Sequence, residues 1–463
     1  MPAPTHVEPA GSDSGGRSPS LAVIGGGSAA EQLCRAVAGD LSVTVYEPDL
    51  VGGECPFVAC MPSKAMLHVA RVDGSWEDAV AHRERVVEHR DDRGHAEELI
   101  DRGVRIRRHR AWLVGPNTVV DESGHRERYD HVVIATGAAA VIPPVDGIED
   151  PELTSLVWTS EDVYRSTDRP PRVVVLGAGV IGHELAELYA RTGSEVVVLE
   201  RRGRTFHEHV PEVAQVVVDA LTAHGVDFRF DVEVERVRPD APGDGRGGRR
   251  VRMEFADGSH VVADRLVVAA GRSARTSGIG LDSVGLDEDE PLPVGRTGRV
   301  DAAGSLWAIG DAAGVGEYTH LANHHADVVA DHLVGDATRT FDDAVLGACM
   351  FTSPPLITVG SSWASLRDDD DIVSVGVDVA SLPRATTDRL AGGHLWAAAS
   401  RSTRTVVAAA GAGPNFDELV HALVVAIDGA VPLDVLARTM QPFPTVGEIL
   451  GLAWRQLHES VTD

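Results

Sequence analysis

The chain contains two copies of a pattern that strongly restricts the possible folds. Each copy runs from an apolar strand through a glycine-rich turn into a helix, and then into a second strand that ends at an acidic residue. In the first copy the strand 21–24 leads into a turn with Gly25 and Gly27, and the strand 41–46 ends at Glu47. This order is the fingerprint of a dinucleotide-binding βαβ unit, with alanine at the third glycine position. The glycines let the backbone approach a pyrophosphate at the helix N-terminus, and the acid accepts hydrogen bonds from ribose hydroxyls.

The second copy is complete. Residues 172–200 contain a strand, a turn with Gly177, Gly179 and Gly182, a helix and a strand that ends at Glu200. Two copies in one chain imply two bound dinucleotides, each held by its own domain.

Three other apolar strands end in short polar motifs. One ends in Thr136-Gly137 and a second ends in Gly271-Arg272, and such ends let the chain cross between two nucleotide domains beside the cofactor. The third ends at Asp311, whose carboxylate can bind the ribityl chain of a flavin.

Two cysteines, Cys55 and Cys60, follow the first turn with four residues between them, and Lys64 comes shortly after. Cysteines at this spacing on the first turn of a helix can close a small disulfide. The positive end of the helix dipole favours a thiolate there. We therefore expect a redox centre, and expect Cys34 and Cys349, the other two cysteines, to be buried packing residues.

Composition limits the function and the location. The chain has 463 residues and a formal charge of −28, which argues against nucleic acid or an anionic membrane as a partner. Four cysteines with one close pair fit a reducing cytoplasm. No apolar run of about 18 residues is present, so we expect no membrane span. Residues 1–20 read as a disordered tail without the features of a signal peptide. We expect no bound metal.

The character of the chain changes after about residue 341. Segments 350–360, 372–379 and 394–410 read as strands, and 415–427 and 433–440 read as helices. This predicts an antiparallel sheet with helices on one side, and we expect this domain to serve in dimerisation. Further upstream, 239–250 reads as a hairpin turn.

This ordered set of motifs resembles the flavin-dependent pyridine nucleotide–disulfide oxidoreductases, which include dihydrolipoamide dehydrogenase, glutathione reductase and mercuric reductase. The resemblance covers 21–450, including Phe351-Thr352. It implies an α/β fold with two Rossmann-like domains, for FAD and NAD(P), and a C-terminal α+β dimerisation domain. The expected division is a tail at 1–20, the FAD domain at 21–153 and 276–342, the NAD(P) domain at 154–275, and the interface domain at 343–463.

The resemblance also implies roles for single residues. Cys60 would lie against the flavin as the charge-transfer thiol, and Cys55 would face the substrate as the interchange thiol. Lys64 would lie near flavin N5, paired with Glu184, because an isolated buried charge is costly. The residues expected to bind FAD or the nicotinamide are Gly25, Gly27, Glu47, Gly53, Lys64, Ala111, Thr136, Gly137, Gly177, Gly179, Gly182, Glu200, Val234, Gly271, Arg272, Asp311 and Thr319.

One position departs from the family. Its thiol-disulfide members have a C-terminal histidine, contributed by the partner subunit, that moves a proton to the interchange thiol; here Phe443 takes its place. Glu448 matches the glutamate that orients this histidine, so it stays a catalytic candidate without its usual partner. General-base help is worth about 10²–10⁴-fold, so efficient lipoamide or glutathione reduction is not expected. A histidine at 320, 324 or 325 could replace the base or could only pack its helix. The mercuric reductase function is disfavoured because the C-terminal cysteine pair is absent.

Several choices stay open at this point. Glu200 favours NADH, whereas Arg201, Arg202 and Arg204 could hold the 2′-phosphate of NADPH. We expect a homodimeric FAD enzyme that passes electrons from NAD(P)H to a disulfide or to a small acceptor such as a quinone. The alternatives are a dithiol oxidase in a biosynthetic pathway and a flavin redox sensor with low turnover.

Overall fold

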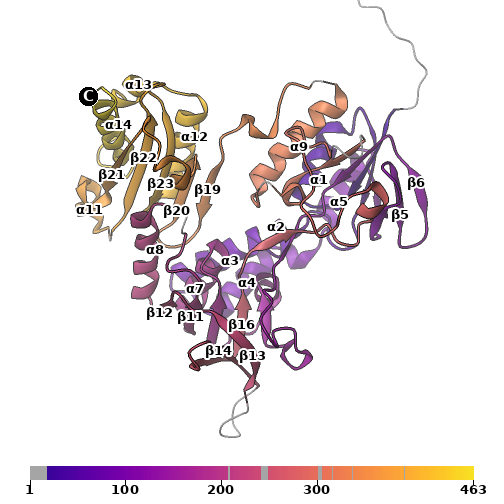
Figure 1. Ribbon diagram of the computed structural model, residues 1–463, viewed down its shortest axis with the longest axis horizontal. Helices are drawn as coiled ribbons and strands as arrows, with labels where there is room; N and C mark the ends of the chain where they lie inside the picture. Colours follow the sequence, from indigo (N-terminus) through magenta and orange to yellow (C-terminus); the bar gives the residue numbers. More distant parts are fainter. Residues whose placement is uncertain are drawn as a thin grey trace, which may run out of the picture.

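The computed structural model describes residues 18–206, 209–240, 249–300, 305–314, 316–335, 337–390 and 392–462. These residues form three units, each built around a five-stranded sheet (Figure 1). Most of the tail expected at 1–20 lies outside the described residues, but Ser20 already belongs to strand β1.

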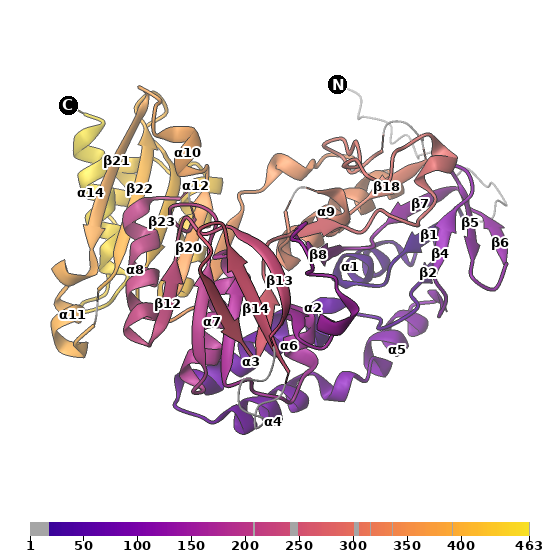
Figure 2. The same ribbon diagram turned by 60° about the horizontal axis from the view of Figure 1, so that its bottom comes forward.

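The first sheet is parallel and has the order β18-β7-β1-β2-β3. Its strands are β1 (Ser20–Ile24), β2 (Ser42–Tyr46), β3 (Arg105–Arg107), β7 (His131–Ile134) and β18 (Leu306–Ala308). Strand β1 has neighbours on both sides and is therefore buried along its length, and every residue after Ser20 is apolar. Helix α1 (Ser28–Val37) begins where β1 ends and packs against α9 (Thr319–Val334), as Figure 2 shows. A meander of β4 (Ala111–Leu113), β5 (Thr118–Asp121) and β6 (Arg126–Arg128) extends this unit.

The second sheet repeats this parallel plan with the order β12-β11-β10-β16-β9. Its strands are β9 (Val157–Thr159), β10 (Arg172–Leu176), β11 (Glu195–Leu199), β12 (Val226–Arg229) and β16 (Arg265–Val268). Its helices are α6 (Ser160–Arg165), α7 (Val180–Arg191) and α8 (Pro211–Ala223).

Three antiparallel strands accompany the second sheet, namely β13 (Val234–Asp240), β14 (Arg250–Phe255) and β15 (His260–Ala263). Asp240 pairs with Arg250, so the strands on either side of the expected hairpin turn are confirmed. Most of the turn itself lies outside the described residues.

The two crossings between these units run side by side. Strand β8 (Ala138–Ala140) directly follows Thr136-Gly137, and β17 (Arg272–Ala274) directly follows Gly271. They pair antiparallel, with Arg272 opposite Ala140. The chain therefore leaves the first unit and returns to it through one two-stranded ribbon.

The third unit has an antiparallel sheet with the order β19-β20-β23-β22-β21. Its elements are β19 (Gly347–Met350), β20 (Leu356–Gly360), β21 (Ile372–Asp378), β22 (His394–Ser400), β23 (Val406–Ala412), α12 (Val420–Asp428), α13 (Leu433–Ala437) and α14 (Glu448–Ser460). Along β22, Leu395 and Ala397 pack with the core of α12 and α14, whereas Trp396 packs with that of α8. The unit's own helices thus cover one face, as expected, and α8 of the second unit covers the other.

Two strand predictions in this unit were wrong. The segment 350–360 is not one strand, because the chain reverses at Ser353-Pro354-Pro355, between β19 and β20. The segment 394–410 is two strands, separated by a polar turn at 401–405. Within the described part of the chain, no helix has the length and apolar character needed to cross a bilayer. The domain boundaries expected from the sequence stay a prediction.

Candidate active site

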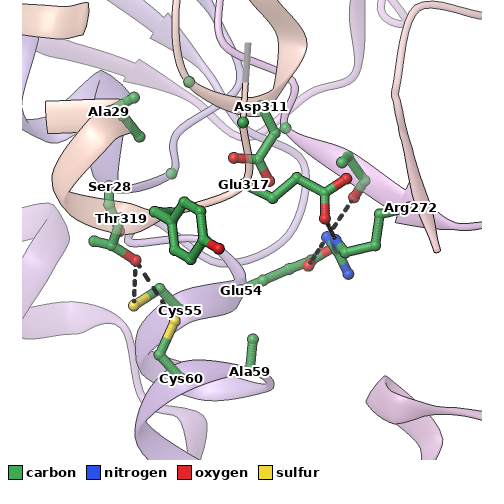
Figure 3. Close-up of a pocket in the computed structure, with 18 of the residues that line it drawn as sticks. Ser28, Ala29, Glu54, Cys55, Ala59, Cys60, Arg272, Asp311, Glu317 and Thr319 are labelled. Atoms are coloured by element: carbon green, nitrogen blue, oxygen red, sulfur yellow. Dashed lines mark hydrogen bonds and ion pairs between the residues drawn. The ribbon is translucent and has the colours of Figure 1, made fainter. Parts of the chain in front are cut away.

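A cavity of about 1680 Å³ is lined by residues of all three units. It extends past the first glycine turn, the cysteine pair and the start of α9 (Figure 3). The expected site residues that line it are Gly25, Gly27, Glu47, Gly53, Cys55, Cys60, Lys64, Thr136, Gly137, Glu184, Arg272, Asp311 and Thr319. Those that do not line it are Ala111, Gly177, Gly179, Gly182, Glu200, Val234, Gly271 and Glu448.

The first glycine turn lets two backbone segments touch. Gly25 has φ +103°, and a Cβ atom there would lie 2.3 Å from the carbonyl oxygen of Ala135. A Cβ atom on Gly53 would lie 2.7 Å from Cα of Gly27. Glu47 accepts a 2.7 Å hydrogen bond from the N–H of Gly26. The cysteine loop therefore rests directly on the turn, beside the N-terminus of α1, which fits a bound pyrophosphate.

The second glycine turn has matching geometry. A Cβ atom on Gly177 would lie 2.4 Å from the carbonyl oxygen of Ala269, and one on Gly182 would lie 2.0 Å from that of Gly177. Glu200 accepts a 3.0 Å hydrogen bond from the N–H of Ala178, as Glu47 does in the first copy. The two copies thus agree in their contacts as well as in their sequence order.

The two cysteines lie on consecutive short helices. Cys55 belongs to α2 (Glu54–Phe57), and Cys60 is the first residue of α3 (Cys60–Arg71). Both are free thiols in this structure, and a disulfide between them stays a prediction. The hydroxyl oxygen of Thr319, at the start of α9, lies 3.2 Å from Sγ of Cys55 and 3.5 Å from Sγ of Cys60.

The surroundings shift the pKa values of the two thiols in opposite directions. The pKa of Cys60 is lowered to about 6, first by the hydrogen bond it accepts from Cys55 and then by Thr319 and the positive Lys64, against the opposing effect of burial. The pKa of Cys55 is raised well above the usual range, because it donates that bond and because it is half-buried. At neutral pH the pair therefore holds one proton, which lies on Cys55.

Lys64 and Glu184 form the ion pair that the resemblance implies. Nζ of Lys64 lies 3.1 Å and 2.8 Å from the two carboxylate oxygens of Glu184, which is nearly fully buried on α7. The same carboxylate accepts a 2.9 Å hydrogen bond from the N–H of Phe351. One glutamate of the second unit therefore binds both the cysteine helix and the turn between β19 and β20 of the third unit.

A charged network that the sequence analysis missed lies beside the cysteine pair, on the side away from Thr319 (Figure 3). Glu54, directly before Cys55, accepts hydrogen bonds from Arg272 at 2.6 Å and from Arg275 at 2.5 Å. Glu317 forms an ion pair with Arg272 at 3.9 Å. Burial raises the pKa of the nearby Asp311 carboxyl, and Arg272 opposes that shift. The available signal was the acidic residue placed immediately before a predicted reactive cysteine.

Some other candidates lie away from the cavity. Ala111 and Val234 are buried core residues of β4 and β13. Glu448 begins α14 and accepts a 3.0 Å hydrogen bond from the N–H of Thr445, and Phe443 is 74% exposed.

The three candidate histidines and the two remaining cysteines lie in different environments. His320 lines the cavity, His324 binds the carbonyl oxygen of Thr340, and His325 is buried against Phe341. Only the first is therefore placed to replace a base. Cys34 is buried as expected. Cys349 packs against the core of the third unit, also as expected, but it is only half-buried and in addition lines the cavity.

The comparisons with known proteins agree with this geometry. Residues 19–326 match the model of the pyridine nucleotide-disulphide oxidoreductases, and 346–453 match the model of their dimerisation domain. Dihydrolipoyl dehydrogenase of Haloferax volcanii is 28% identical over 457 residues, 92% of this chain and 94% of that protein. Mercuric reductase of Streptomyces lividans is 28% identical over 460 residues, 94% of this chain and 95% of that protein. The HOCl-induced flavoprotein disulfide reductase RclA from Escherichia coli shares the fold, with a TM-score of 0.85 at 24% identity over 94% of this chain and 99% of that one.

Proposed function

This chain belongs to the pyridine nucleotide–disulphide oxidoreductase family, and we propose that it passes electrons from NADH or NADPH, through FAD and the pair Cys55–Cys60, to a disulfide or a small acceptor such as a quinone. The observation that carries the proposal is the contact of both sulfurs with the hydroxyl of Thr319, inside a cavity that also contains the first glycine turn.

The residues of the cavity fit FAD. The contact between Gly27 and Gly53 leaves backbone rather than side chains beside the N-terminus of α1, where a pyrophosphate would bind. Glu47 would bind the adenosine ribose and Asp311 the ribityl chain, with Lys64 near the ring system. FAD, when bound, supplies the chemistry that accepts a hydride from the nicotinamide and passes the electrons on.

The two cysteines of the pair differ in protonation state. Cys60 is held as a thiolate, and Cys55 keeps the proton. In the reduced pair Cys55 is the interchange thiol, and its proton must leave before the sulfur can attack a disulfide. No base at position 443 assists that step, since phenylalanine cannot accept a proton. This disfavours efficient reduction of lipoamide or glutathione and favours acceptors that need little proton transfer.

The homodimer is part of the proposal. The dimerisation-domain match includes the segment around Phe443, and this side chain is largely exposed in the single chain. Its position matches that of the family histidine that reaches the active site across the dimer. A second copy would therefore place an apolar ring where the relatives place a base.

We favour NADH over NADPH. Glu200 accepts hydrogen bonds from the N–H groups of Ala178 and Arg202, which fixes its carboxylate at the end of β11. A fixed negative charge there repels a 2′-phosphate. Arg204 donates to the carbonyl oxygens of Phe206 and His209, so its guanidinium group is already engaged.

The first experiment compares wild type and Cys55→Ser after anaerobic reduction by NADH and mixing with a quinone. Reoxidation at the wild-type rate in the variant would mean that the acceptor does not use the cysteines, which would overturn electron transfer through the pair for that acceptor. Failure of the variant would support that route. Cys349→Ser is the matched control, because it removes another cavity-lining thiol outside the pair. Incubation of a reduced dithiol with NAD⁺ tests the reverse direction, the formation of a disulfide.

A further inference from the structure

The carboxylate of Glu54 connects the cysteine loop to the ribbon between the two nucleotide units. Each of its oxygens accepts a hydrogen bond from a different arginine, Arg272 or Arg275. Arg272 also donates a 2.8 Å hydrogen bond to the carbonyl oxygen of Ala138 on the paired strand β8. The side chain of Glu54 is 24% exposed and that of Arg272 is 15% exposed, so solvent only partly screens this pair. The segment immediately before Cys55 is therefore tied to the paired strands β8 and β17.

The same arginine also reaches the segment that contains Thr319. Glu317 lies two residues before Thr319 and pairs with Nε of Arg272 at 3.9 Å. Arg272 thus lies between two carboxylates, one beside Cys55 and one beside the hydroxyl group that contacts both sulfurs. Figure 3 shows Glu54, Arg272 and Glu317 meeting to one side of the cysteine pair, with Thr319 on the other side.

We propose that Glu54 is a positioning residue: through Arg272 and Glu317 it holds the Cys55 segment against Thr319, so that the hydroxyl stays within reach of both sulfurs. This inference rests on the proposed role of Cys55 and Cys60 as the reactive pair. Within the described residues, Glu54 forms no hydrogen bond to either sulfur, and it acts through the geometry of its neighbours.

A positioning role and a purely electrostatic role predict opposite results. Removing a negative charge near a thiol lowers the pKa of that thiol, because the thiolate is then less strongly repelled. Loosening the contact with Thr319 raises the pKa of the thiolate-forming sulfur, because a hydrogen bond to the charged form is lost. The substitution Glu54→Gln removes the charge and weakens the contacts to both arginines, so the sign of the shift shows which role dominates.

The other groups near the sulfurs are known and stay unchanged in this test. Lys64 lies on the helix that begins with Cys60 and favours its thiolate. Glu184 binds that lysine, and the phenol of Tyr164, on α6, also interacts electrostatically with Cys60. The substitution at Glu54 touches none of these contacts directly.

The test uses the FAD-loaded, reduced protein and follows alkylation by iodoacetamide as a function of pH, with mass spectrometry to identify the modified cysteine. The measured value is the apparent pKa of the pair. We expect Glu54→Gln to raise it by about half a unit, part of the effect of losing the hydroxyl contact altogether. In a Thr319→Val background the same substitution should no longer raise the pKa. A lowered or unchanged pKa in the wild-type background would overturn the proposal.

Controls separate this outcome from other failures. Asp146→Asn makes the same chemical change at another carboxylate bonded to an arginine, at 2.6 Å from Arg236 on the second unit, and should leave the pKa unchanged. If Glu54→Gln does not fold or retain FAD, Glu317→Gln takes its place, because it removes the other, more exposed carboxylate and predicts the same upward shift. A downward shift there would also refute the proposal. If the wild-type thiols titrate like ordinary cysteines, the proposed function fails instead.

Discussion

The hydroxyl of Thr319 should contribute to the lowered pKa of Cys60, after the larger effect of the hydrogen bond from Cys55. Once Cys60 is a thiolate, it is a stronger acceptor than the protonated Cys55, so it should receive the hydroxyl proton. A hydrogen bond to a charged group contributes about 1.5–3 kcal/mol, and the lower end applies because the oxygen is shared between two sulfurs, at 3.2 Å and 3.5 Å. At 1.36 kcal/mol for each pKa unit, Thr319→Val should raise the pKa of Cys60 by about one unit, from about 6 to about 7.

This shift has a direct kinetic consequence. At about pH 6 the thiolate fraction should fall from about one half to about one tenth, so alkylation should slow about five-fold, whereas well above both pKa values the rates should converge. Thr319→Ser is the matched control, since it keeps the hydroxyl and should keep the pKa. Equal pH profiles for the valine variant and wild type would show that the contact contributes nothing to thiolate stability and would refute the reasoning.

Three further predictions concern the cofactor sites and the central ion pair. Gly53→Ala should lower flavin retention and the melting temperature, because Gly53 has φ +73° and the new methyl group would lie 2.7 Å from Cα of Gly27. Gly39→Ala is the control and should change neither, because nothing lies within 4 Å of the added methyl group. Equal flavin content in both variants would contradict the proposed FAD-binding role of the contact between Gly27 and Gly53. Glu184→Leu should lower the free energy of unfolding, measured in urea, by about 3 kcal/mol, since it leaves Lys64 and the N–H of Phe351 without their partner. Glu184→Gln should lower it clearly less, and equal losses would mean that the charge of the carboxylate is unimportant for stability. Glu200→Ala should reduce the ratio of kcat/KM for NADH to that for NADPH, and an unchanged ratio would show that this acid does not select the nicotinamide.

The features that the sequence predicted well are those determined by neighbours in the chain. The glycine turns, the acids that follow the second strand of each copy and the cysteines at a helix start all depend on contacts within one βαβ unit or one loop. Their signals are short-range, and in both turns the glycines let two backbone segments approach closely. The Lys64–Glu184 pair came from the family resemblance, because no local pattern joins residues 120 positions apart.

The errors have physical causes that can be named. Pro354 and Pro355 are poorly suited to a central strand, so the prolines already contradicted a single strand over 350–360. Helix α14 was missed, although its apolar residues Ile449, Leu450 and Trp454 recur at helical spacing and are buried. Glu54 and Arg272 are 218 positions apart in the sequence, and no rule based on sequence spacing predicts a contact between two charged residues at that separation.

The ribbon of β8 and β17 also affects the order in which the chain can fold during synthesis. Strand β7 pairs with β1 on one side and with β18 on the other, but β18 is made only after the entire second unit has left the ribosome. Until then one edge of the nascent sheet is open, and an open edge is a site for pairing with another chain. When the second unit folds, its two ends meet in the ribbon, and the long loop that β18 would otherwise have to close is already closed. Folding of the inserted second unit therefore brings β18 close to the open edge of the first sheet.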